Sequence, residues 1–133
     1  GRLMMESAME ALKETDIKVF GVTALTSLSD IDTHQIYQRT AADQVNAMLD
    51  IAEEAKIDGV VCSPHELELV TARGSLLSIT PGIRLSDLND DQTRIMTPKQ
   101  AIDLGANYLV IGRPITGAED ISEALNTIYQ SIN

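Results

Sequence analysis

The chain has 133 residues, a mass of 14.4 kDa, 44% hydrophobic residues and a formal net charge of −10, so we expect one domain, 1–133, with a hydrophobic core. The negative charge argues against nucleic acids and anionic membranes as partners, because both repel an acidic surface. No apolar run reaches the ~18 residues of a membrane span, and residues 1–13 show no signal-peptide pattern. The single cysteine, Cys62, excludes an intrachain disulfide and favours a reducing cytoplasm.

The first half of the chain alternates helical and extended patterns. It begins at Gly1 without a methionine and enters a helical pattern at once, which indicates an internal piece of a longer protein. Apolar spacing predicts an amphipathic helix over 3–14, and the β-branched run at 17–25 predicts a strand buried on both faces. The polar residues 26–40 predict a loop with at most one helical turn. Thr40 then caps a predicted helix over 41–56.

The second half repeats the alternation with clear capping signals. A strand at 58–62 precedes a Ser-Pro-x-Glu capping box and a short helix that stops near 73–74. A strand at 76–80 leads into a long polar loop, and Thr97 with Gln100 caps the next helix, which ends before Gly105. The last elements are a strand at 107–111 and a helix over 118–132, with Ile121, Leu125, Ile128 and Ile132 on one face.

Four strand–helix units in succession predict an α/β fold with parallel strands and outer helices. The segments "IDGVVCSP" and "ANYLVIGRP" share a strand, a turn and a proline at the same offsets, which supports repetition. In parallel α/β folds ligands bind where the carboxyl ends of the strands meet the following loops. Candidate site residues therefore belong to the loops that follow the four strands.

The candidate anion site lies at the last strand's end, where Gly112 and Arg113 follow directly. A glycine lets a ligand approach the backbone, and an arginine presents a planar fork that suits phosphate. Arg84 holds the same place after the preceding strand, so two arginines at neighbouring strand ends make a more specific site than one. The alternatives are a surface arginine at 113 and an ordinary type II turn at Pro81-Gly82.

Other residues near the strand ends could have either a ligand-binding role or a structural role. Gln92 in the long loop either folds over a ligand as part of a lid or faces water. The hydroxyl of Thr26 either bonds a planar heterocycle or caps the loop, and the residues alone favour capping. Cys62 is a small core residue rather than a nucleophile, since no base neighbours it in the pattern. His34 and His65 lack the spacing of metal ligands, so no metal site is expected.

Five stretches of the sequence, taken together, point to one protein family. In this order they closely resemble orotidine 5'-phosphate decarboxylases of the bacterial type: "VTALTS", "DGVVCSPHE", "TPGIR", "DDQTRIMTP" and "YLVIGRPIT". The resemblance covers essentially the whole chain. It implies that Gly112 and Arg113 hold the 5'-phosphate of orotidine 5'-phosphate (OMP) or UMP, with Arg84 supporting the same side. It further implies that Gln92 closes over the phosphate and reaches the base, and that Thr26 hydrogen-bonds the pyrimidine ring.

The resemblance also implies a fold and an activity. The family is a homodimeric, cytoplasmic (β/α)8 (TIM) barrel that converts OMP to UMP and CO2 in pyrimidine biosynthesis, with no cofactor or metal. Such a barrel needs ~250 residues, so this chain corresponds to its second half, strands five to eight. The family's catalytic Asp-x-Lys-x-x-Asp motif is absent. We therefore expect a carboxy-lyase by family and an inactive chain by itself.

Two other functions stay open. One is a non-catalytic half-barrel that binds a nucleotide or serves as an assembly piece, and the other is a related sugar-phosphate barrel enzyme such as a hexulose-phosphate synthase. Four parallel strands alone would leave two open edges and an uncovered apolar face. The isolated chain is therefore expected to pair with another copy, to pair with the missing half, or to be partly molten.

Overall fold

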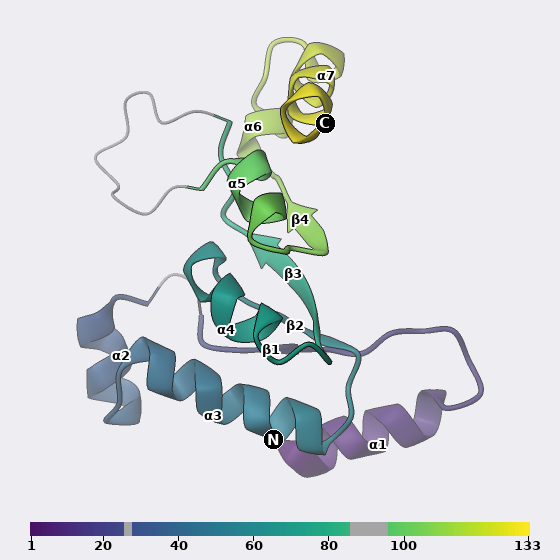
Figure 1. Ribbon diagram of the computed structural model, residues 1–133, viewed down its shortest axis with the longest axis vertical. Helices are drawn as coiled ribbons and strands as arrows, with labels where there is room; N and C mark the ends of the chain where they lie inside the picture. The colour runs from purple at the N-terminus through teal and green to yellow at the C-terminus, as the bar shows by residue number, and fades with distance from the viewer. Residues whose placement is uncertain (26–27, 86–95) are drawn as a thin grey trace.

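The computed structural model describes residues 1–25, 28–85 and 96–133 (Figure 1). Its strands are β1 (Phe20–Val22), β2 (Gly59–Val61), β3 (Leu77–Pro81) and β4 (Tyr108–Val110). The helices are α1 (Arg2–Leu12), α2 (Asp30–Tyr37), α3 (Ala41–Glu54), the 3-10 turn η1 (Pro64–Glu66), α4 (Leu67–Thr71), α5 (Pro98–Asp103), α6 (Arg113–Thr116) and α7 (Ile121–Ile132).

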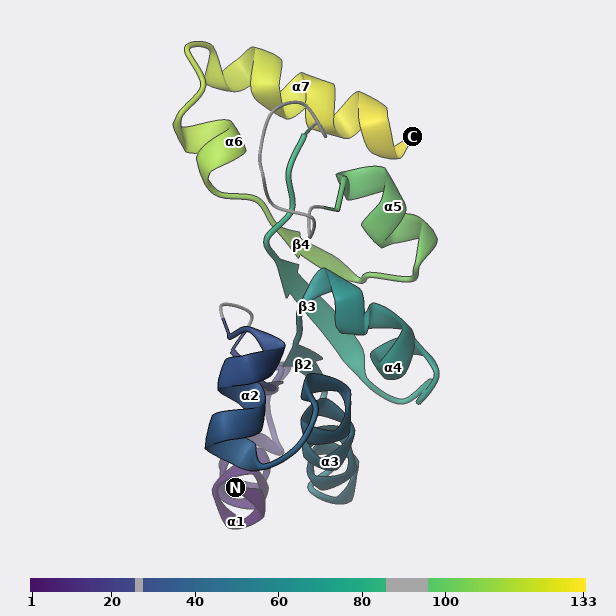
Figure 2. The same cartoon turned by 90° about the vertical axis from the view of Figure 1, so that its left-hand side faces the viewer.

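The four strands form one parallel sheet in the order β1-β2-β3-β4. Helices α3, α4 and α5 lie along the same side of this sheet (Figure 2). Alternate strand residues that face these helices are fully buried, among them Val60, Cys62, Ser78 and Thr80. They pack in a core with Val45 and Leu49 of α3 and with Leu67 and Val70 of α4. The predicted α/β fold with parallel strands and outer helices is confirmed.

The other face of the sheet is not covered. Val22 of β1 is 58% exposed, and Tyr108 and Val110 of β4 are 48% and 49% exposed. The prediction that the first strand is buried on both faces is therefore wrong, because the helices of this chain cover only one face. The rings of Phe20 and Tyr108, from the two outer strands, meet edge to face with centroids 6.1 Å apart. This contact shows that the sheet curls around its uncovered face.

The capping signals in the sequence are confirmed. The hydroxyl of Thr40 accepts a hydrogen bond from the N–H of Asp43 at the start of α3, at 3.1 Å. Reciprocal capping boxes join Ser63 to Glu66 and Thr97 to Gln100. Each box satisfies backbone groups that would otherwise lack partners at a helix start. The caps fix where the chain turns from a strand end into the next helix.

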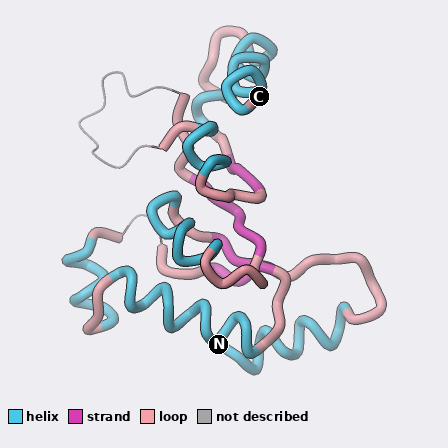
Figure 3. Tube along the Cα trace, in the orientation of Figure 1, coloured by secondary structure: helices cyan, strands magenta, loops and turns pink. Residues whose placement is uncertain are grey.

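Two helices were not expected. Residues 26–40 were predicted to be a loop, yet α2 spans eight of them and begins with a capping box between Ser29 and Asp32. The short helix α6 lies where a loop was predicted, directly after Gly112. Figure 3 shows both as helical segments. The sequence signal for α2 was weak because its polar and apolar residues have no helical period.

The two terminal helices expose apolar residues. Helix α1 buries none of its residues, with Leu3 80% exposed. On α7, Ala124 and Ile128 face the protein, whereas Ile121, Leu125 and Tyr129 are exposed. The predicted apolar face of the last helix is thus only partly buried. Within the described residues, no helix is both long and apolar enough to cross a membrane.

Candidate functional site

A pocket of about 830 Å³ opens at the carboxyl ends of the strands. Its walls come from the segments that follow β1, β2, β3 and β4 and from the first residues of α2 and α3. This is the edge of a parallel sheet at which α/β proteins bind their ligands. The segments are distant in sequence and meet only because the strands run in the same direction.

Arg84 reaches this pocket from a firmly held backbone. Ile83 before it is fully buried and forms a parallel bridge with Met96, and the N–H of Arg84 donates to the Met96 carbonyl at 3.1 Å. Within the described residues, the guanidinium donates one hydrogen bond, from Nη1 to the carbonyl of Ile83 at 3.3 Å. The other four of its five N–H donors have no partner among the described residues.

Arg113 lines the same pocket from the first position of α6. Its side chain is exposed and makes no hydrogen bond or ion pair with the described residues, so its guanidinium is open to an anion. A Cβ placed on Gly112 would meet no atom within 4 Å. Packing therefore does not demand a glycine there, and the space above its backbone is free. The two predicted arginines do converge on one cavity.

Two predicted site residues, Thr26 and Gln92, lie outside the described residues. Leu25 and Leu28, on either side of the first, line the pocket. Gln92 lies in the sequence between Ile83 and Met96, which form a parallel bridge. Their roles as ring and phosphate contacts stay predictions.

The turn after β2, one of the strand-end segments in which the sequence placed candidate site residues, supplies polar groups to the pocket. Ser63, His65 and Glu66 all line it. The Ser63 N–H donates to Oε2 of Glu66 at 3.0 Å, which orients this carboxyl. Burial raises the pKa of Glu66, partly opposed by that hydrogen bond and by His65.

Cys62 lies just below this turn and is fully buried. Burial raises the pKa of its thiol to about 11, so the thiol is neutral at physiological pH. A neutral, inaccessible thiol is a poor nucleophile. The prediction that Cys62 is a core residue is confirmed.

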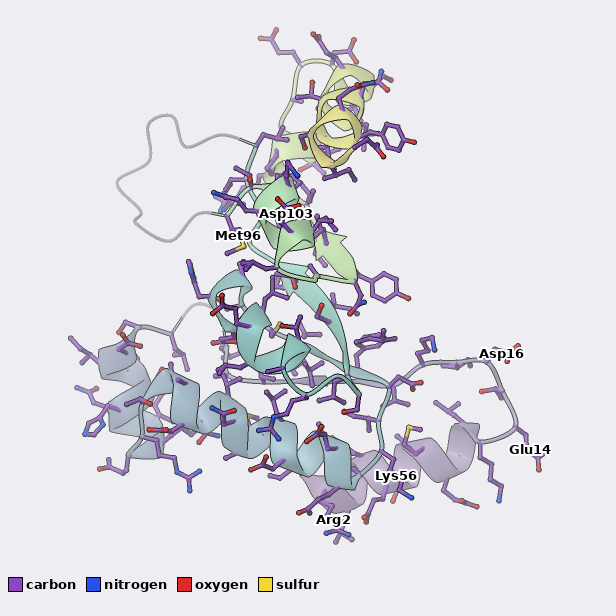
Figure 4. The ribbon with its side chains drawn as sticks, in the orientation of Figure 1. Arg2, Glu14, Asp16, Lys56, Met96 and Asp103 are labelled. Carbon is purple, nitrogen blue, oxygen red and sulfur yellow. The ribbon has the colours of Figure 1, made fainter. Side chains whose placement is uncertain are left out.

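The acidic character of the chain does not produce a metal site in the described part. No group of three histidine, cysteine, aspartate or glutamate side chains there is close enough to hold an ion. Figure 4 shows Glu14 and Asp16 on the connection before β1, well apart from Met96.

The sequence analysis placed candidate site residues in the loops after the strands, but it did not predict that the start of helix α2 forms one wall of the pocket. Leu28, Ser29, Asp30 and Thr33 line it there. The hydroxyl of Thr33 is buried and donates to the Ser29 carbonyl at 2.9 Å. The Ser-x-x-Asp spacing at 29–32 was a usable capping signal for this helix.

Comparison with known proteins decides the family. The sequence model described as "Orotidine 5'-phosphate decarboxylase / HUMPS family" matches residues 1–128. The chain belongs to this family. An orotidine 5'-phosphate decarboxylase of Saccharophagus degradans is 48% identical over 96% of this chain, and one of Glaesserella parasuis is 45% identical over 99%. The chain spans 56% and 60% of these family members' lengths.

Solved structures agree with this family assignment. The orotidine 5'-phosphate decarboxylase of Lactobacillus acidophilus matches the whole chain with a TM-score of 0.79 at 34% identity, and the chain covers 59% of it. The enzyme from Sulfolobus solfataricus matches with a TM-score of 0.65 at 18% identity, which supports the fold alone. The four parallel strands and their helices thus match part of the family fold.

Proposed function

We propose that this chain is the phosphate- and pyrimidine-binding part of an orotidine 5'-phosphate decarboxylase. The observation that carries the proposal is the convergence of Arg84 and Arg113, from neighbouring strand ends, on one pocket. Two guanidinium groups at one cavity suit a phosphate dianion. Family membership and 45–48% identity to decarboxylases favour OMP as the ligand.

The position of the chain within a full barrel is part of the same proposal. We assign residues 1–133 to strands five to eight of a TIM (β/α)8 barrel. Four parallel strands and coverage of 56–60% of the relatives support a partial barrel. The intact enzyme would be a cytoplasmic homodimer that converts OMP to UMP and CO2.

The proposed chemistry divides between this part and the rest of the enzyme. Arg113, Gly112 and Arg84 hold the phosphate, while Gln92 closes over it and Thr26 bonds the ring. Binding energy from the remote phosphate is used to close the site and favour the transition state. The proton donor, a lysine of an Asp-x-Lys-x-x-Asp motif, has no counterpart in this chain.

Ligand binding to the purified chain tests the proposal. We expect UMP to bind more tightly than uridine by calorimetry, and Arg113→Ala to weaken UMP binding at least about tenfold, since a charge-assisted hydrogen bond contributes about 1.5–3 kcal/mol. Arg39→Ala removes an exposed arginine that does not line the pocket and serves as the matched control. Equal UMP affinity of the chain and the Arg113 variant would contradict the phosphate assignment.

The absence of the lysine motif favours a second candidate for the chain by itself, a half-barrel that binds a nucleotide without turnover. UMP binding without CO2 release from OMP would support this candidate. The third candidate, a sugar-phosphate enzyme, predicts instead that a pentulose phosphate displaces UMP from the pocket. Failure of a pentulose phosphate to compete would exclude it.

A further inference from the structure

Glu66 is a charged residue in the wall of the pocket to which the proposed function gives no role. It is the last residue of η1, the turn that follows β2, and its side chain is half-buried. The Oε2 atom accepts a hydrogen bond from the N–H of Ser63 at 3.0 Å, which completes the capping box of this turn. One oxygen of the carboxyl group therefore has a structural task, and the other, Oε1, does not.

The second oxygen of Glu66 is accessible. Among the described residues, Oε1 has no hydrogen-bond partner, and Glu66 forms no ion pair with Arg84 or Arg113. Within the same residues, Oγ1 of Thr80 is the only fully buried side-chain oxygen or nitrogen without a partner, so Oε1 is not buried. Since Glu66 lines the pocket, this oxygen presents a free hydrogen-bond acceptor to the cavity.

Capping alone does not require a carboxylate at this position. In the capping box at the start of α5, the amide oxygen of Gln100 performs the same task and accepts from the N–H of Thr97 at 2.9 Å. Gln100 is exposed, whereas burial raises the pKa of the Glu66 carboxyl, although the Ser63 bond and His65 oppose this. Burial thus disfavours the ionised form of Glu66. A neutral glutamine would cap η1 without this desolvation penalty.

We propose that Glu66 is a further ligand-binding residue, whose Oε1 accepts a hydrogen bond from an N–H or O–H group of the nucleoside part of the ligand. The inference rests on the proposed function, because it takes a pyrimidine nucleotide as the ligand of this pocket. A carboxylate repels a phosphate and accepts from neutral donors, so Glu66 meets the end of the nucleotide that carries no charge. In UMP the donors at that end are the imide N–H of uracil and the hydroxyls of ribose. The phosphate lies with Arg84 and Arg113.

Glu66→Gln separates the ligand contact from the cap. As at Gln100, the amide oxygen keeps the hydrogen bond to the N–H of the capping residue, and the NH2 group then puts a donor in the place of Oε1. We expect an unchanged melting temperature and, by calorimetry, a UMP affinity at least about tenfold lower, since hydrogen bonds to charged groups are stronger than neutral ones. The matched control is Glu68→Gln, at an exposed position of α4 that does not line the pocket, and it leaves UMP affinity unchanged.

Ligand analogues identify which donor the carboxylate binds. 3-Methyl-UMP lacks the imide N–H, and 2'-deoxy-UMP and 3'-deoxy-UMP each lack one ribose hydroxyl. The analogue without the relevant donor binds the parent chain more weakly than UMP does, but it binds Glu66→Gln as tightly as UMP does, because the two changes remove the same contact. Inorganic phosphate has no nucleoside part, so it binds Glu66→Gln no more weakly than the parent chain.

Several results would overturn this inference. Equal UMP affinity of the parent chain and Glu66→Gln would overturn it alone, and the proposed function would stand if Arg113→Ala still weakened UMP binding. A purely structural role would lower the melting temperature of Glu66→Gln and weaken phosphate binding as much as UMP binding. Analogues that lose the same affinity in both proteins would also contradict the contact. No UMP binding to the parent chain would overturn the proposed function and this inference together.

Discussion

At the scale of single residues, Arg84 and Arg113 differ in how they are held. Arg84 follows a buried isoleucine and is fixed by a backbone hydrogen bond to Met96, whereas Arg113 is exposed and free of described partners. The sequence indicated both arginines, because each directly follows a strand, but gave no sign of this difference.

Arg113→Ala in an intact enzyme should therefore affect catalysis far more than folding. The exposed side chain makes no described contact, so we expect a change in the free energy of unfolding within about 0.5 kcal/mol. The kcat/KM for OMP should fall by at least about tenfold, from the loss of a charged phosphate contact. Kinetics together with urea unfolding separate the two effects. An unchanged kcat/KM would refute the role of Arg113.

Cys62 gives a pH dependence that can be measured. Its pKa is raised by burial from 9.0 to about 11, so the folded protein keeps a proton that the unfolded chain releases. The free energy of unfolding should fall as the pH rises from 9 to 11, by about 2 kcal/mol. Urea unfolding of the chain and of Cys62→Ala at both pH values gives the difference. Equal slopes for the two proteins would show that the thiol is not the source.

At the scale of elements, the start of β2 depends on a glycine. A Cβ on Gly59 would overlap the carbonyl oxygen of Leu77 and lie 2.6 Å from Cε1 of Phe20. Gly59 thus lets three neighbouring strands approach one another. From the sequence alone this residue was simply the second residue of a predicted strand.

Gly59→Ala should therefore be strongly destabilising, by about 3 kcal/mol or more, because the overlapping atom belongs to the backbone and cannot rotate away. The matched control is Gly1→Ala, whose Cβ would meet nothing within 4 Å and should leave stability unchanged. Thermal melts followed by circular dichroism compare the two. A melting temperature of Gly59→Ala equal to that of the parent chain would contradict the packing argument.

At the scale of the whole molecule, the chain is a four-stranded parallel sheet with helices packed on one of its two faces. Its core lies between the sheet and one layer of helices, and its ligand pocket is built at one edge of that sheet. The two arginines that line the pocket are present, whereas the Asp-x-Lys-x-x-Asp motif that the proposed function requires is not in the sequence. Under the proposed function, ligand binding and proton transfer therefore belong to different parts of the enzyme.

The chain alone should release no CO2 from OMP above the uncatalysed rate, since it holds no proton donor of the family motif. Adding the part of the Saccharophagus degradans decarboxylase that this chain does not cover should supply that donor and restore turnover. The full-length Saccharophagus degradans enzyme is the positive control. Turnover by the purified 133 residues alone, with an intact mass of 14.4 kDa, would contradict this prediction.

The sequence by itself determined the alternation of strands and helices, the capping boxes at Ser63 and Thr97, and the two arginines at strand ends. These features depend on local chemistry, such as hydroxyl caps and apolar runs, that neighbouring residues reveal. Only the tertiary structure decided that one face of β1 is exposed and that the start of α2 lines the pocket. It alone also showed that Gly59 leaves room for Leu77 and Phe20 on the neighbouring strands. Burial and close approach depend on elements distant in sequence, and no local pattern encodes which of them cover a given face.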